Sequence, residues 1–349
     1  MSKKFTLSMA IFATVFSLFA GTQAASATTA PEFPASEQLN AFGYYKADDT
    51  QYAALPHYGQ VPAVIDPVTG GATVTPEDRT ELASPSASEL TNAGADSATG
   101  KTWALYRDCS LWSIDADGTV VSFDLQTKLS ATDAYDCFAF MIRDDSTAVV
   151  FGNIDLGSGA TKSVFELDLT DVSLISGSIK TVNFYIGGMA TDPTTGDIWV
   201  SVVWADGDNG IYKYDMASGI DMASHIATTD LWGMAFDSTG TLWATDWGNR
   251  SGGLDCANYS CLSYLVPTAA DAFSTFGTVG EMKDSAGKSF VSSGIWISQK
   301  ESTIVDSEKA ETLADTGASD SSGLYALFAA LLIASGLRMM NRSRQKARK

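Results

Sequence analysis

The stretch Leu231-Trp-Gly-Met-Ala-Phe-Asp-Ser-Thr-Gly-Thr-Leu-Trp-Ala-Thr-Asp246 decides the fold of this chain. An apolar run enters a short Asp-Ser-Thr-Gly turn, and a second apolar run leaves it. Trp, Phe and Thr favour strands, Asp suits the start of a turn, and Gly accepts the positive φ that a turn often needs. The stretch therefore predicts a β-hairpin.

The same hairpin recurs at a regular spacing along the chain. The large residue after each turn marks one repeat, and the markers lie 48, 48, 48, 44 and 47 residues apart: Leu55, Trp103, Phe151, Trp199, Trp243 and Phe290. The turn before Phe151 lacks the Gly, and the match at Leu55 is the weakest. Repeats of about 40–50 residues with several strands each are typical of propeller blades. The sequence predicts an all-β, six-bladed β-propeller over residues 40–298 with about 47 residues per blade, and five or seven blades as the alternative.

Propeller geometry assigns these turns to one face. The turn between the first and second strands of a blade lies on the bottom face, and the connections between the second and third strands and between blades lie on the top face. We therefore expect the Asp-x-x-Gly turns at the bottom, with structural Asp residues. The segment Pro34–Leu39 has no blade of its own, and no fourth strand follows Ile295–Ser298. Because an unpaired edge is unfavourable, we expect these two segments to pair and close the ring.

The N-terminus has the features of a secretory signal peptide. Lys3 and Lys4 precede the apolar run Leu7–Ala20, and small residues follow, ending in Ala25-Ser26-Ala27. This order predicts a signal peptide over residues 1–27 with an A-x-A cleavage site. A transmembrane anchor is the weaker interpretation, because the run is shorter than the ~20 residues that a span needs. Residues 28–39 form a lead-in.

The C-terminus has the features of a second targeting signal. The motif Leu313-Ala314-Asp315-Thr316-Gly317 precedes an apolar segment, Leu324–Leu337, and a basic tail that stays cytoplasmic. This order resembles the cell-wall sorting signal of Gram-positive surface proteins, with Ala314 in place of the Pro of LPxTG. In that family a sortase cuts between Thr and Gly and joins the Thr to peptidoglycan.

The resemblance implies that residues 313–349 are a sorting signal and that residues 299–312 are a spacer. The partners that it implies are a sortase recognising LAxTG and peptidoglycan. The protein would be secreted and anchored to the cell wall, and its apolar segment would be a membrane-inserted helix before sorting. A plain single-pass tail anchor is the alternative.

The charge of the chain excludes two classes of partner. The net charge is −19. Without the two leader lysines and the six basic residues and one Asp of the tail, residues 28–316 hold 14 basic and 40 acidic residues, a net charge of −26. Nucleic acids and anionic lipids both require basic patches, so neither is expected as a partner. We expect a soluble monomer, with Ca²⁺ as a candidate ligand of its carboxylates.

The four cysteines predict disulfides, because an even number in an extracellular protein usually pairs. Of the three pairings, we favour Cys109–Cys137 with Cys256–Cys261. Cys109 falls in a loop between the second and third strands of its repeat, and Cys137 comes just before the next innermost strand. Both are top-face positions of neighbouring blades.

The motif G-M-A-x-D…G-x-x-W recurs from Gly188 to Trp199 and from Gly233 to Trp243. With this motif the chain resembles extracellular six-bladed propellers of the NHL and SMP-30/gluconolactonase-like kind. The resemblance implies an alternative function, a secreted metal-dependent hydrolase of lactones. Such an enzyme holds its metal with inward carboxylate and Asn ligands, but the innermost strands here have no repeated acid. The chain has two histidines and no G-x-S-x-G, so no catalytic residue is assigned.

Loops of the fourth and fifth repeats hold the candidate ligand site on the top face. Its candidate residues are Trp204, Asp206, Asp230, Trp232, Asp246 and Trp247. Aromatic rings flanked by polar groups are typical of binding hot spots. The alternative is that the tryptophans pack between sheets and that the acids are solvated. The sequence thus predicts a cell-wall-anchored surface protein whose propeller presents an adhesion or recognition face to an extracellular glycan or protein.

Overall fold

The computed structural model describes residues 30–45, 61–74, 90–96, 98–115, 119–143, 146–157, 159, 161–205, 207–228, 230–246, 261–270, 272 and 276–300. The chain divides into two units, Met1–Lys300 and Glu301–Lys349. The second unit, with the sorting motif and the apolar segment, lies outside the described residues, as does the signal peptide. Within the described residues, no helix is both long and apolar enough to cross a membrane.

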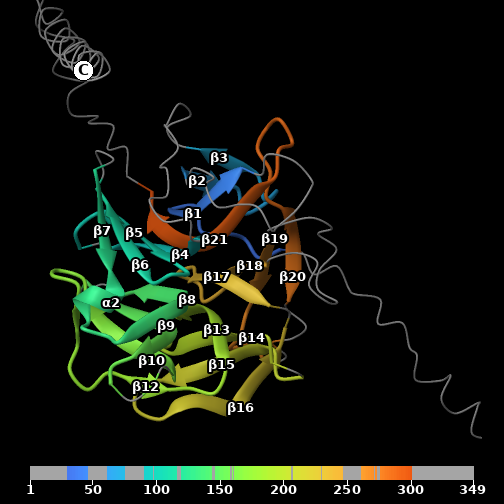
Figure 1. Cartoon of the computed structure of the whole chain (residues 1–349). Helices are drawn as coiled ribbons and strands as arrows, with labels where there is room; N and C mark the ends of the chain where they lie inside the picture. Colours follow the sequence, from blue (N-terminus) through green and yellow to red (C-terminus); the bar gives the residue numbers. More distant parts are fainter. Residues whose placement is uncertain are drawn as a thin grey trace, which may run out of the picture. The chain divides into compact units, whose positions relative to one another are not determined.

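The described strands form five antiparallel sheets, which we call blades 1 to 5 (Figure 1). Blade 1 contains β4 (Leu90–Asp96), β5 (Lys101–Tyr106), β6 (Ser110–Ile114) and β7 (Val120–Asp124). Blade 2 contains β8 (Asp133–Ile142), β9 (Thr147–Asp155), β10 (Thr161–Asp168), β11 (Ser173–Leu174) and β12 (Lys180–Thr181). The short helix α2 (Leu125–Lys128), capped by Asp124, connects these two blades.

The remaining blades follow the same order from inside to outside. Blade 3 contains β13 (Tyr185–Thr191), β14 (Ile198–Val203), β15 (Gly210–Asp215) and β16 (Gly219–Ala227). Blade 4 contains β17 (Leu231–Phe236), β18 (Leu242–Asp246), β19 (Cys261–Leu265) and β20 (Gly277–Glu281). Blade 5 contains β21 (Phe290–Gln299), β1 (Glu37–Tyr45), β2 (Val61–Ile65) and β3 (Ala72–Val74).

The innermost strands close into a ring. Each of β4, β8, β13, β17 and β21 contacts the next, and β21 contacts β4. The described part of the chain is therefore a five-bladed β-propeller. The all-β propeller prediction is confirmed, and the count matches the five-bladed alternative, so the preferred count of six is wrong.

The first and last repeats account for the difference, because they are two parts of one blade. Strand β1 pairs antiparallel with β21, from Glu37 opposite Gln299 to Tyr45 opposite Phe290. This pairing confirms that the N-terminal segment closes the ring. Since β1, β2 and β3 add to β21, the last marker, Phe290, begins an innermost strand and not a second strand. The marker Leu55 lies outside the described residues.

The quoted hairpin shows how the repeat builds a blade. All six residues of β17 are buried, and Trp243 on β18 is fully buried in the core. The Asp237 carboxylate accepts hydrogen bonds from Thr239 N (2.9 Å) and Oγ1 (2.6 Å), from Thr241 N (3.0 Å) and from Trp243 Nε1 (2.9 Å). Gly240 adopts a φ of 84°, which glycine tolerates best. Asp237 thus ties the turn to the buried indole.

A disulfide joins Cys109, in the β5–β6 connection, to Cys137 on β8. It links blades 1 and 2, as predicted. Cys261 is also disulfide-bonded, while Cys256 lies outside the described residues.

Candidate functional site

The top face carries the exposed aromatic side chain around which the candidate site is built. Neighbouring strands of a blade are antiparallel, so the β5–β6, β9–β10 and β14–β15 connections lie opposite the turns that follow the innermost strands. The innermost strands begin on this same face. Trp204 follows β14 in the β14–β15 connection and is 39 % exposed, the most exposed of the tryptophans whose side chains are described.

Three aromatic rings hold Trp204 in place. The ring centroids of Phe138, Tyr185 and Trp232 lie 5.2, 5.4 and 5.2 Å from that of Trp204, all edge to face. Phe138 lies in the middle of β8, whereas Tyr185 begins β13 and Trp232 is the second residue of β17, and the three strands belong to neighbouring blades. Phe138 and Trp232 are each only 2 % exposed. We call Phe138, Tyr185, Trp204 and Trp232 the Trp204 cluster.

The backbone at Trp204 is strained. Its φ is +56°, in the left-handed region that bulky residues rarely adopt. Such a conformation persists only where the surroundings enforce it, at a cost of about 1–3 kcal/mol. Here the three rings and the following loop provide that enforcement.

Polar contacts fix the loop that carries Trp204. Asn209 accepts a hydrogen bond from Ala205 N through Oδ1 and donates through Nδ2 to Asp230 Oδ1, both at 2.7 Å. The Tyr212 hydroxyl donates to Asp208 O at 2.7 Å. Burial, together with the charge of Asp208, raises the pKa of Tyr212. His225 stacks on Tyr212 with ring centroids 4.6 Å apart.

Two cations lie over rings of the cluster. The Lys162 ammonium, on β10 of blade 2, is 3.9 Å from the ring centroid of Tyr185. The Arg107 guanidinium is 5.3 Å from the centroid of Phe138, and its Nε pairs with Asp136 Oδ1 at 2.8 Å. The disulfide between Cys109 and Cys137 covalently links blades 1 and 2 at this part of the top face.

The structure brings together three of the six predicted site residues. Trp204, Asp230 and Trp232 meet around the β14–β15 loop. Trp232 is buried, so it supports the cluster from below and offers no free face. Asp206 and Trp247 lie outside the described residues, and so does the side chain of Asp246, whose backbone ends β18.

Sequence reasoning missed Phe138, Tyr185 and Lys162 as members of this site. Phe138 begins the apolar run of the innermost strand β8 and Tyr185 begins the innermost strand β13, and these positions could have identified them. Lys162 gives no such signal. It reaches Tyr185 from the third strand of the neighbouring blade, so only the packing of the blades reveals the contact.

A pocket of about 500 Å³ opens at the bottom mouth of the central channel. Each innermost strand contributes three residues to it, and Met141, Met189 and Met234 are among them. None of its lining residues is a carboxylate, Asn or His. Within the described residues, no group of three or more His, Cys, Asp or Glu side chains could hold a metal. The residues that line this channel pocket therefore do not fit the metal site that a lactonase-like hydrolase requires.

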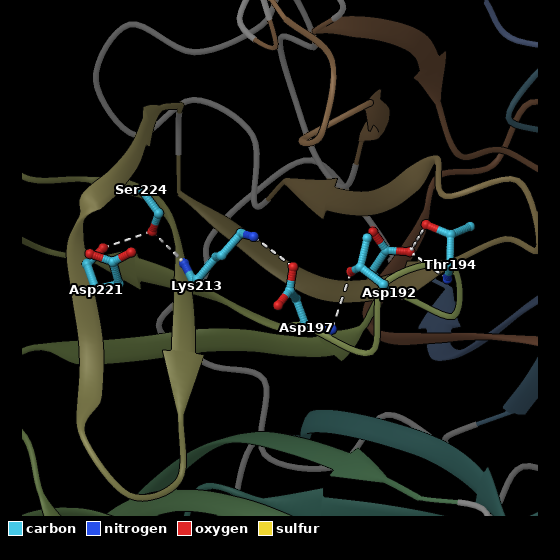
Figure 2. A network of polar contacts seen from close by, with 7 residues as sticks. Asp192, Thr194, Asp197, Lys213, Asp221 and Ser224 are labelled. Carbon is cyan, nitrogen blue, oxygen red and sulfur yellow. Dashed lines mark hydrogen bonds and ion pairs between the residues drawn. The ribbon is translucent and has the colours of Figure 1, made fainter.

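Polar contacts on the bottom side of blade 3 hold its strands and turn together (Figure 2). The Lys213 ammonium pairs with Asp197 Oδ2 at 2.6 Å and lies 5.5 Å from the ring centroid of Trp199. The hydrogen bond from Lys213 lowers the pKa of Asp197. Asp192 accepts hydrogen bonds from Thr194 N and Oγ1. These contacts give the bottom-face acids structural roles, as the turn pattern predicts.

No family model matches the chain, and no curated protein matches it. A solved structure of a protein of unknown function from Bacteroides caccae is similar, with 12 % identity and a TM-score of 0.41, over 76 % of this chain and 100 % of that one. The Pan2 WD40 domain of Neurospora crassa is similar with 6 % identity and a TM-score of 0.38, over 78 % of this chain and 89 % of the domain. These likenesses concern the fold alone.

Proposed function

We propose that this protein is a cell-wall-anchored binding module whose propeller recognises an extracellular ligand through Trp204 on its top face. The observation that carries the proposal is the state of Trp204. Trp204 is 39 % exposed, yet three rings restrain its side chain and its backbone is held in a strained conformation. Strained residues cluster at functional sites.

The arrangement suits binding because little order is lost when a ligand arrives. A side chain that is already immobilised does not lose rotamer freedom on association, which can otherwise cost about 0.5–1.5 kcal/mol for a mobile side chain. The disulfide at Cys109 and the bonds of Asn209 likewise hold the neighbouring loops before any ligand binds. Aromatic anchors of this kind account for much of the energy in binding sites.

Binding can be tested with a panel of immobilised glycans and extracellular-matrix proteins, probed with the wild-type protein and with Trp204→Ala. We expect the wild type to bind at least one of them and Trp204→Ala to lose that binding. Met222→Ala is the matched control, since it removes another exposed apolar side chain, on β16 of blade 3. Equal binding by Trp204→Ala and the wild type would contradict the proposal.

The anchoring part of the proposal rests on the sequence. The spacer 299–312 separates the propeller from the LAxTG motif, and residues 28–316 are strongly acidic, as suits a solvated surface protein. In a Gram-positive host with a sortase that recognises LAxTG, we expect wild-type protein in the peptidoglycan fraction and Thr316→Ala in the membrane fraction. Thr303→Ala, in the spacer, is the control. Covalent attachment of Thr316→Ala to peptidoglycan would rule out this anchor.

A further inference from the structure

We infer that the ligand of the Trp204 cluster is a sugar that carries a carboxylate, with its ring on Trp204 and its carboxylate at Lys162. The inference rests on the proposed function and names the chemistry of the ligand. It follows from three properties of the described residues: an exposed flat ring, a nearby cation without an ion-pair partner, and the overall charge of the chain.

The first property is the exposed ring of Trp204. Three edge-to-face neighbours restrain the indole of Trp204, and the residue remains 39 % exposed, so it offers apolar surface in a restrained orientation. The C–H groups on one face of a pyranose ring form a flat apolar surface of matching shape. Trp and Tyr rings combine such apolar area with a polar edge, which suits a partner that is apolar on one face and hydroxylated at its rim.

The cation lies within reach of the same ligand. The ring centroid of Tyr185 is 3.9 Å from Lys162 Nζ and 5.4 Å from the ring centroid of Trp204. The ammonium is therefore at most about 9 Å from the Trp204 ring. A single sugar ring with a carboxylate substituent can bridge this distance.

Lys162 differs from the other cations described above. Lys213 is paired with Asp197, and Arg107 with Asp136. Among the described residues, Lys162 forms no ion pair. Its only polar contact there is a long hydrogen bond of 3.5 Å to the Asn183 carbonyl. The Lys162 ammonium lies over an aromatic ring and has no carboxylate partner among the described residues. It can therefore form an ion pair with a carboxylate of the ligand.

The charge of the chain makes this position selective. Residues 28–316 hold 14 basic and 40 acidic residues, so their net charge of −26 disfavours the approach of anions. An anionic ligand can bind only where a cation offsets that field, and Lys162 supplies one beside the exposed ring. A neutral sugar has no charge to pair with Lys162, so the ion pair with this lysine is the feature that distinguishes acidic from neutral ligands.

The test uses a glycan array of matched neutral and acidic oligosaccharides, the acidic members carrying uronic or sialic acid, followed by calorimetry on the best pair. We expect the acidic member to bind about fivefold more tightly, as one exposed ion pair allows. Lys162→Gln should remove that preference and leave the neutral affinity unchanged. Lys213→Gln makes the same charge change at another cation over a ring and should keep the preference. Trp204→Ala should weaken both by about thirtyfold, as for a hot-spot residue.

Salt provides a second readout. Raising the NaCl concentration from about 0.1 M to about 1 M shortens the screening length from about 10 Å to about 3 Å. The preference for the acidic sugar should therefore shrink in the wild type and stay absent in Lys162→Gln.

The outcomes separate this inference from the proposed function. Equal binding of acidic and neutral sugars that still depends on Trp204 overturns the inference and leaves the proposed function standing. If the protein binds only immobilised proteins, and this binding depends on Trp204, the inference is likewise overturned and the proposed function stands. Trp204-independent binding overturns both.

Discussion

Replacement of Asp237 by alanine should destabilise the propeller more than any other change in a turn described above. Its carboxylate accepts four hydrogen bonds, and Asp237, Thr241 and Trp243 are all buried. Thr239 is exposed, so water can replace its two bonds after the substitution. The Thr241 amide and the Trp243 indole N–H would remain buried without an acceptor.

The magnitude follows from these two donors. A buried donor that loses its partner costs about 1–3 kcal/mol. For Asp237→Ala we therefore expect a loss of about 2–6 kcal/mol in the free energy of unfolding. Asp237→Asn keeps one carbonyl oxygen, but its amide nitrogen cannot accept from Trp243 Nε1. Its free energy of unfolding should fall by about 1–3 kcal/mol, the cost of leaving the Trp243 indole N–H buried without an acceptor.

The assay is equilibrium unfolding in urea, followed by tryptophan fluorescence and far-ultraviolet circular dichroism. Asp284→Ala is the matched control, because Asp284 accepts hydrogen bonds from Ala286 N and Lys288 N, which are both exposed. That variant should stay within about 0.5 kcal/mol of the wild type, as surface changes usually do. An equal loss in Asp237→Ala and Asp284→Ala would refute the argument from buried donors.

Three further predictions concern stability. Trp232→Ala should lose about 3–5 kcal/mol as a buried side chain, and Trp204→Ala about 1.5–4.5 kcal/mol, the sum for its three aromatic pairs; thermal melts compare the two. Burial raises the pKa of Tyr106 above its unfolded value of about 10. Its contribution to the free energy of unfolding is therefore fully present below about pH 10 and is lost as the pH rises further. Tyr106→Phe should reduce that alkaline loss in urea titrations at several pH values. Replacing Cys109 and Cys137 by serine should cost about 3–4 kcal/mol for a sequence separation of 28 residues, measured by unfolding against the oxidised wild type.

The blades could be predicted from sequence because the strand propensities and turn residues within each repeat determine its local structure. The Asp that begins a turn and the Trp that follows it are paired directly in the quoted hairpin, where Asp237 accepts from Trp243. The hairpin predicted over Leu231–Asp246 is formed by β17 and β18, which begin and end at these residues. Local propensity, turn chemistry and burial agree in these segments, and such agreement makes a pattern reliable.

The blade count failed because repeats along a chain are not the same as blades around a ring. The predicted pairing of the chain ends already implied that the first and last repeats share one sheet, as β1 and β21 do. Counting six markers treated them as two blades. The spacing of the markers holds no information about which strands meet across the closure.

The candidate site could be predicted only in part. Trp204 and Trp232 are similar in sequence context, each adjoining a run of apolar residues and near an Asp. Trp232 is the second residue of a strand that is buried throughout, whereas Trp204 follows one and lies in a loop. The contact between Lys162 and Tyr185 depends on how blades 2 and 3 pack, and no local pattern encodes that packing.

Glycine and other residues occupy left-handed backbone positions on both faces of the propeller. Bottom turns mostly use glycine, as at Gly100, Gly196 and Gly240, where positive φ carries little strain. On the top face, Cys109, Asp136 and Trp204 adopt it with side chains attached. Cys109 forms a disulfide and Asp136 pairs with Arg107. The side chain of Trp204 is the one of these three whose role the fold does not explain.

This comparison leads to a last prediction. Gly196 has φ of +78° and nothing within 4 Å of the position of an added Cβ, so Gly196→Ala measures backbone strain alone. We expect it to lower the free energy of unfolding by about 1 kcal/mol. Trp204→Gly relieves a similar strain but removes three ring pairs worth about 0.5–1.5 kcal/mol each, so its free energy of unfolding should fall by no more than about 3.5 kcal/mol while ligand binding is lost. Urea unfolding and the glycan array measure the two effects separately. A larger loss of stability in Trp204→Gly would instead make the indole a structural plug between blades.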